Sequence, residues 1–302
     1  MASSGLRSYI ALMEKLSNQS EARRRRFRAI PVRMLVPNVI TLLALCAGLT
    51  AIRLSTEERT GLALGAIVFA AMLDGIDGRV ARLIKGQSRF GAELDSLADL
   101  VNFGVAPGLI LYFWQLHELH NGGWIASLVF AISGGLRLAR FNSTMDDPDK
   151  PAFAANYFTG VPAPAGAICV LLPIYVALLG GPVWPSTLTA LYALGIAFLM
   201  ISRLPVFSGK TIGTRVPPEM VLPAFVLVVL FIALLIGYPW YVLTSGTLLY
   251  LASLPVGYFS YRRQQQRAAD TQAAAAPAPA TPAESFHPPG EHEPEARPPR
   301  LN

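Results

Sequence analysis

Eight apolar runs recur along this chain, and each is about long enough to cross a lipid bilayer. They lie near residues 36–54, 61–84, 92–116, 124–144, 161–180, 186–202, 219–237 and 240–260. In lipid, every backbone polar group must be satisfied within the protein, and about twenty apolar residues in a helix span the hydrocarbon core. We therefore expect an all-α polytopic membrane bundle of about eight transmembrane helices. Helix kinks or caps are expected at Pro162, Pro164, Pro173 and Pro223.

The composition agrees with a membrane protein, because 53% of the 302 residues are hydrophobic and 15% are charged. The net charge of +6 comes from basic residues at the ends of apolar runs and in the N-terminal arm. This placement favours anionic lipid as a partner, and we expect no nucleic-acid binding. Cys46 and Cys169 both lie within apolar runs, so no disulfide framework is implied.

Three segments of different composition divide the chain. Residues 1–33 form a basic juxtamembrane arm, in which apolar residues recur every three or four positions. This pattern predicts an amphipathic helix on the membrane surface, with a disordered basic arm as the alternative. Residues 34–261 hold the apolar runs and form the membrane domain. Residues 262–302 are rich in Ala, Pro, Glu, Gln and Arg, and we expect a disordered tail.

The connections between the runs indicate an orientation. Lys and Arg are enriched in the arm, in the tail and in alternate connections, such as the one that holds Lys85 and Arg89. Short cytoplasmic loops carry this excess in membrane proteins. We therefore expect a multi-pass protein of the cell membrane with both termini in the cytoplasm.

Four aspartates lie within or beside the second and third apolar runs, at Asp74, Asp77, Asp95 and Asp99. Spacings of three and four place each pair on one helix face, roughly 4.5 and 6 Å apart along the axis. Carboxylates at membrane depth cost several kcal/mol each, so they should face a cavity and a cationic partner. Arg79 and Arg82 are too few to neutralise all four. Oxygen ligands without nearby Cys or His predict a site for Mg²⁺, Mn²⁺ or Ca²⁺.

The acids belong to a longer pattern, Asp-x2-Asp-Gly-x2-Ala-Arg-x8-Gly-x3-Asp-x3-Asp. It is filled by Asp74, Asp77, Gly78, Ala81, Arg82, Gly91, Asp95 and Asp99. This pattern resembles the signature of the CDP-alcohol phosphatidyltransferase family of integral membrane enzymes. The resemblance implies a donor, CDP-diacylglycerol, from which a phosphatidyl group is transferred with release of CMP. It also implies two divalent ions, Mg²⁺ or Mn²⁺, held by the four aspartates, with Asp99 as general base, and a homodimer.

The same resemblance implies a set of donor-binding residues. Gly78, Ala81 and Arg82 match family positions at the nucleotide and pyrophosphate. A Pro-Asn-Val-Ile-Thr stretch at the start of the first run resembles a segment that contacts the donor, through Pro37, Asn38 and Thr41. Pro-Asn before an apolar run is also a common way to begin a helix, so this part stays open.

Four further stretches resemble the branch of the family that uses L-serine as acceptor. They are L-V-N-F-G-V-A-P, G-G-L-R-L-A-R-F-N, F-T-G-V-P-A-P-A and S-R-L-P-V-F-S-G-K, and the likeness runs from about residue 37 to 261. Arg137 and Arg140 lie three apart on one helix face, so both are expected to point toward the acids, where arginine can bind a carboxylate through two hydrogen bonds. Membrane anchoring at a helix end is the alternative for this pair. Ser96, Asn142 and Lys210 are weaker candidates for the same serine site.

Two other functions remain open from the sequence alone. Glycerol 3-phosphate or an inositol phosphate as acceptor would require extra cations for the second phosphate, and the sequence does not exclude either. A metal-ion transporter is also conceivable, because intramembrane acids mark ion pathways. The Gly-x2-Ala-Arg sequence that follows Asp77 argues against it, because metal transport alone does not require this pattern.

Overall fold

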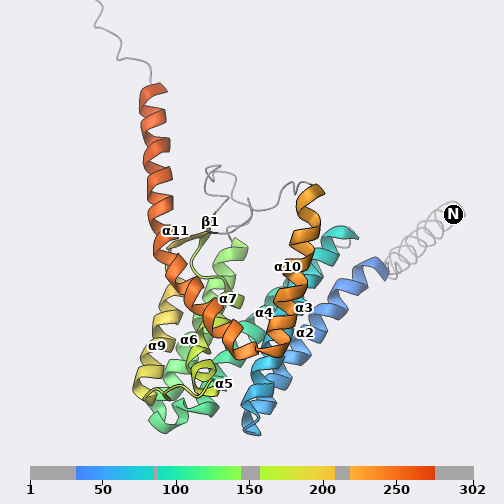
Figure 1. Ribbon diagram of the computed structural model, residues 1–302, viewed down its shortest axis with the longest axis vertical. Helices are drawn as coiled ribbons and strands as arrows, with labels where there is room; N and C mark the ends of the chain where they lie inside the picture. Colours follow the sequence, from blue (N-terminus) through green and yellow to red (C-terminus); the bar gives the residue numbers. More distant parts are fainter. Residues whose placement is uncertain (1–31, 85–87, 144–156, 208–217, 276–302) are drawn as a thin grey trace, which may run out of the picture. The chain divides into compact units, whose positions relative to one another are not determined.

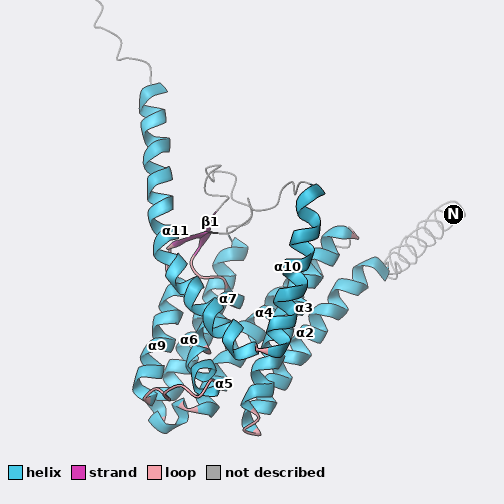
Figure 2. Ribbon diagram, viewed as in Figure 1, coloured by secondary structure: helices cyan, strands magenta, loops and turns pink. Residues whose placement is uncertain are grey.

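The computed structural model describes residues 32–84, 88–143, 157–207 and 218–275. These residues form helices α2 (Val32–Thr56), α3 (Thr60–Leu83), α4 (Arg89–Asp99), η1 (Leu100–Val105), α5 (Ala106–Trp114), η2 (Leu116–Leu119), α6 (Asn121–Ser143), α7 (Ala163–Val170), α8 (Leu172–Leu178), α9 (Ser186–Ile201), α10 (Pro218–Gly237) and α11 (Pro239–Ala275), together with strands β1 (Tyr157–Thr159) and β2 (Pro205–Phe207). The expected all-α architecture is confirmed, and Figure 2 shows how small the strand content is. The N-terminal arm lies outside the described residues apart from its last two positions.

Six of the described helical stretches are long and apolar enough to cross a membrane. They are Leu35–Thr56, Thr60–Leu83, Arg89–Trp114, Asn121–Ser143, Glu219–Gly237 and Pro239–Gln266. The expected number of eight is therefore not confirmed. The run at 186–202 forms the apolar but 16-residue helix α9, and the run at 161–180 is divided into α7 and α8.

The division between α7 and α8 has a local cause. Pro173 lies in the first turn of α8, and proline has no N–H to donate to the carbonyl group four residues earlier. Its ring also clashes with that carbonyl, so the helix ends before it. Pro223 lies inside helix α10 instead of at its end, so the expected kink there stays a prediction.

The third membrane stretch changes its helical winding directly after Asp99. Helix α4 passes into η1, a π-helix, and then into α5 without a break in the chain. Pro107 lies in the first turn of α5 and removes one backbone donor, which favours the wider winding before it. The sequence pattern predicted the span but not this change of winding.

Small residues allow close helix contacts around η1. A Cβ atom on Gly134 of α6 would lie 3.1 Å from the Cα atom of Gly104 in η1. A Cβ atom on Gly48 of α2 would lie 2.0 Å from Oδ1 of Asn102, also in η1. Small residues at such contacts are typical of membrane helix packing. The stretch that follows Asp99 is thus held between α2 and α6 (Figure 1).

A two-stranded ribbon joins two of the stretches that the sequence analysis singled out. Strand β1 pairs antiparallel with β2, with Phe158 opposite Val206. Gly160 follows β1 with a φ of +77°, and a Cβ atom there would lie 2.6 Å from the carbonyl oxygen of Met200. Only glycine fits this close, left-handed turn.

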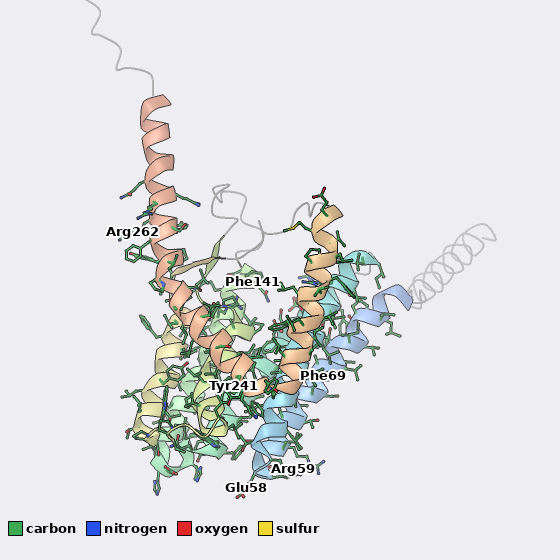
Figure 3. All side chains as sticks on the ribbon, viewed as in Figure 1. Glu58, Arg59, Phe69, Phe141, Tyr241 and Arg262 are labelled. Atoms are coloured by element: carbon green, nitrogen blue, oxygen red, sulfur yellow. The ribbon has the colours of Figure 1, made fainter. Side chains whose placement is uncertain are left out.

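Large apolar side chains face outward on the membrane-spanning helices. Phe69 is 54% exposed and Tyr241 is 64% exposed, and Figure 3 shows both on the surface of the ribbon. The turn with Glu58 and Arg59 lies at one end of α2 and α3, whereas Phe141 lies toward the other end of the helices (Figure 3). An outward apolar surface between polar ends is what a lipid-embedded chain requires, so the protein is a multi-pass membrane protein.

Helix α11 extends beyond residue 261, where the segment with the apolar runs ends. We expected disorder from residue 262, but residues 262–275 are helical. Ala, Gln and Arg dominate this stretch and have high helix propensity, which composition-based reasoning about disorder overlooked. Residues 276–302 lie outside the described part of the chain.

Candidate active site

Three of the four aspartates come together from two helices. Asp74 on α3 and Asp95 and Asp99 on α4 each offer a carboxylate oxygen, and these oxygens lie within 4.8 Å of one another. All three residues are half-buried. Among the described residues, no Lys or Arg side chain forms an ion pair with them. Three close carboxylate oxygens suit a hard divalent cation.

The fourth acid, Asp77, lies beside this cluster and has a different partner. Its Oδ2 atom accepts a 2.7 Å hydrogen bond from the Thr41 hydroxyl on α2, and the residue is 3% exposed. The Thr41 hydroxyl also lies 3.1 Å from the carbonyl oxygen of Pro37. Asp77 still interacts electrostatically with Asp74 and Asp95. Its role as a metal ligand therefore stays a prediction.

A cavity of about 510 Å³ borders the acids. It is lined by Pro37, Asn38, Thr41, Asp77, Gly78, Ala81, Arg82, Ser88, Arg89, Gly91, Ala92 and Asp95. All six residues that the resemblance assigned to the donor thus lie around one cavity, which meets the acid cluster at Asp95. The volume lies within the range of small-molecule sites in proteins.

The beginning of α4 is fixed against α2 by a cap and a glycine. The Ser88 hydroxyl accepts a 3.0 Å hydrogen bond from the Gly91 backbone N–H, which caps the helix. A Cβ atom on Gly91 would lie 2.7 Å from Oδ1 of Asn38, so only glycine fits there without displacement. At Gly78, in contrast, a Cβ atom would meet nothing within 4 Å. The space beside Gly78 therefore belongs to the cavity.

The two arginines expected to bind serine have different surroundings. Arg137 is 9% exposed, and its guanidinium interacts electrostatically with Asp99. Arg140 instead donates a 2.5 Å hydrogen bond from Nη1 to the carbonyl oxygen of Ile201, at the end of α9. Arg137 is thus close enough to Asp99 for an electrostatic interaction, and Arg140 links α6 to α9.

Of the weaker serine candidates, Ser96 and Asn142 do not line the cavity. The Asn142 side chain donates a 2.9 Å hydrogen bond to the Ser96 hydroxyl, which links α6 to α4. Lys210 lies outside the described residues. A role for Ser96, Asn142 or Lys210 with serine stays a prediction.

Sequence reasoning missed some of the residues at this site. Ser88, Arg89 and Ala92 also line the cavity, and the polar connection before α4 was the signal that could have identified the first two. No feature of the sequence indicated the hydrogen bond from Thr41 to Asp77, because the two residues lie on different helices.

Comparison with known proteins agrees with this geometry. A family model described as CDP-alcohol phosphatidyltransferase matches residues 34–202, and a second, described as CDP-alcohol phosphatidyltransferase 2, matches residues 219–255. The first match covers α2 to α9 and contains all four aspartates.

Curated relatives extend the likeness beyond the matched domains. A protein of Mycobacterium leprae is 39% identical over 254 residues, which cover 83% of this chain and 82% of the relative. One from Helicobacter pylori strain 26695 is 35% identical over 221 residues, covering 72% of this chain and 88% of the relative. Both are named CDP-diacylglycerol–serine O-phosphatidyltransferase. This chain belongs to the CDP-alcohol phosphatidyltransferase family.

Proposed function

We propose that this protein is a phosphatidylserine synthase, that is, a CDP-diacylglycerol–serine O-phosphatidyltransferase of phospholipid biosynthesis. It transfers a phosphatidyl group from CDP-diacylglycerol to L-serine and releases CMP. The names of its relatives support this assignment. The observation that carries it is the meeting of three carboxylates with a cavity lined by the predicted donor residues.

The carboxylate ligands of the acid cluster fit the divalent metal that the family implies. Asp74, Asp95 and Asp99 supply three oxygen ligands within 4.8 Å, and Asp77 lies next to them as a further ligand. Mg²⁺ or Mn²⁺, as one or two ions, is the metal that this set would hold. When bound, the metal would neutralise the pyrophosphate and the charge that develops at phosphorus.

Residues of the cavity bind the donor. Arg82 lines it one turn beyond Gly78, where its guanidinium can hold phosphate oxygens. The open space beside Gly78 admits the nucleotide close to the backbone of α3. Asn38 and Thr41 contribute from α2, and Thr41 also fixes the orientation of Asp77.

On the acceptor side, Asp99 and Arg137 have separate roles. Asp99 accepts the proton of the serine hydroxyl as that oxygen forms a bond to the phosphorus of the phosphatidyl group. The bond between this phosphorus and the CMP oxygen breaks, and CMP leaves. Arg137, which is buried and interacts electrostatically with Asp99, binds the serine carboxylate.

Orientation and assembly complete the proposal. The basic connections support an active site at the cytoplasmic face of the membrane, with both termini on the same side. Assembly as a homodimer rests on the family resemblance.

The test compares acceptors side by side. Purified protein in detergent with CDP-diacylglycerol and Mn²⁺ is given L-serine, glycerol 3-phosphate or an inositol phosphate, and CMP release is measured. We expect CMP release with L-serine and accumulation of phosphatidylserine. Turnover with a phosphorylated acceptor and not with L-serine would overturn the assignment of the acceptor while leaving the family intact.

A further inference from the structure

Two buried hydrogen-bond donors, one on α6 and one on α11, have no partner within the described residues. They are Nε of Arg137 on α6 and the phenolic oxygen of Tyr250 on α11. Leaving a buried polar group unpaired costs about 1–3 kcal/mol, and more when the group is charged. Each such atom in a native structure calls for an explanation, and a water, an ion or a ligand can complete it.

The side chains of Arg137 and Tyr250, which carry these two hydrogen-bond donors, lie in one region of the molecule. The Arg137 guanidinium interacts electrostatically both with the Asp99 carboxylate and with the Tyr250 phenol. The guanidinium carbon also lies 5.9 Å from the centroid of the Phe141 ring. The Tyr250 ring packs against the hydrophobic core, so only its hydroxyl is available for a polar contact.

This place is separate from the donor cavity. The cavity reaches the acids at Asp77 and Asp95. Arg137 and Tyr250 do not line it, and Arg137 interacts with the acids at Asp99. Asp99 is the residue proposed to receive the acceptor's proton. A second substrate that meets the donor at the acids would therefore lie on the side of Arg137, the residue with which Tyr250 interacts.

We propose that the Tyr250 hydroxyl, together with Arg137, binds the carboxylate of the amino-acid acceptor. The inference rests on the proposed function and adds a residue that selects the acceptor. A planar carboxylate accepts a hydrogen bond from the guanidinium on one oxygen and from the phenol on the other. The pair carries a single positive charge, which matches one carboxylate and is less suited to the dianionic phosphate of a phosphorylated acceptor.

The test removes only the hydroxyl, in the variant Tyr250→Phe. The matched control is Tyr192→Phe, because Tyr192 is also a half-buried tyrosine but donates its hydroxyl to the carbonyl oxygen of Cys169, at 2.8 Å. We expect the KM for L-serine to rise about tenfold in Tyr250→Phe, as for the loss of one hydrogen bond to a charged group. The KM for CDP-diacylglycerol should be unchanged, and Tyr192→Phe should leave both KM values unchanged.

A substrate analogue shows which group of serine the hydroxyl contacts. L-serinamide replaces the carboxylate by a neutral amide and keeps the reacting hydroxyl. Wild-type protein should favour L-serine over L-serinamide in kcat/KM, and this preference should fall about tenfold in Tyr250→Phe. An equal loss for both acceptors would overturn the assignment of Tyr250 to the carboxylate, and so would a rise in both KM values that includes the donor.

The inference and the proposed function fail in different ways. If wild-type protein releases no CMP with L-serine, the proposed function is wrong and the inference falls with it. If wild-type protein uses L-serine and Tyr250→Phe has the same KM for it, only the role of Tyr250 is overturned.

Discussion

Asp99 is the residue at which the acid cluster and the buried arginine meet. In Asp99→Asn the side chain keeps its shape but can no longer accept a proton. We expect kcat to fall by about 100-fold to 10,000-fold, the usual contribution of a general base. Binding of CDP-diacylglycerol should be partly retained, because Asp74, Asp77 and Asp95 remain.

The matched control for this variant is Glu93→Gln, an exposed carboxylate two residues before Asp95 on the same helix. It lies outside the acid cluster and should leave CMP release unchanged. Equal losses in Asp99→Asn and Glu93→Gln would mean that the effect is one of net charge rather than of proton transfer.

Thr41 tests how strongly the donor site depends on the orientation of Asp77. Thr41→Val preserves the shape but removes the 2.7 Å hydrogen bond to Asp77. Loss of a hydrogen bond to a charged group predicts a rise of about tenfold in the KM for CDP-diacylglycerol, with no change for L-serine. Thr50→Val on the same helix is the control, because Thr50 donates only to the carbonyl oxygen of Cys46. A higher KM for L-serine in Thr41→Val would place Thr41 on the acceptor side instead.

At the scale of elements, the contact between α2 and η1 holds the stretch that follows Asp99. In Gly48→Ala the new Cβ atom would lie 2.0 Å from Oδ1 of Asn102, which is 1% exposed, and 3.3 Å from the backbone Cα atom of the same residue. Overpacking of this kind costs about 1–3 kcal/mol, so the melting temperature in detergent should fall.

Gly65→Ala is the control for this prediction, because nothing lies within 4 Å of the added Cβ atom. It should leave the melting temperature unchanged or raise it slightly, since alanine favours the helix by up to about 1 kcal/mol. Equal melting temperatures for the two variants would show that α2 and η1 are not packed as described.

The sequence predicted the elements far better than their details. The lengths of the apolar runs and the polar residues between them predicted the ends of α2, α3 and α6 to within a few residues, because these features depend on local chemistry. The π-helix after Asp99 and the division of the run at 161–180 depend on how single prolines interrupt the helical backbone. Their consequences differ with context: Pro173 ends a helix, whereas Pro223 lies within one.

At the site, too, the spacing of residues in the sequence predicted some features and not others. The spacing of the acids predicted that they would converge, and the donor residues were found around one cavity. Spacing on one helix could not reveal that Asp77 accepts a hydrogen bond from Thr41, or that Arg140 donates one to the carbonyl oxygen of Ile201. Tyr250 was missed because it lies in an apolar run far from the signature.

For the whole molecule, the basic connections predict the orientation in the membrane. Single cysteines at Gly86 and at Gly122, which flank the span Arg89–Trp114, should react with an impermeant thiol reagent from opposite sides of sealed vesicles. The native Cys46 and Cys169 are first replaced, so that only the new thiols report. Labelling of both positions from the same side would contradict a crossing by this span.

The central claim is that the acid cluster works with a divalent cation in phosphatidyl transfer, and metal removal tests it most directly. Four carboxylates would repel the pyrophosphate of CDP-diacylglycerol if nothing neutralised them. CMP release with CDP-diacylglycerol and L-serine is measured after exhaustive chelation and again as Mn²⁺ or Mg²⁺ is added back. We predict no CMP release above background in the chelated protein and full recovery with the added cation. Full turnover after chelation would contradict the account.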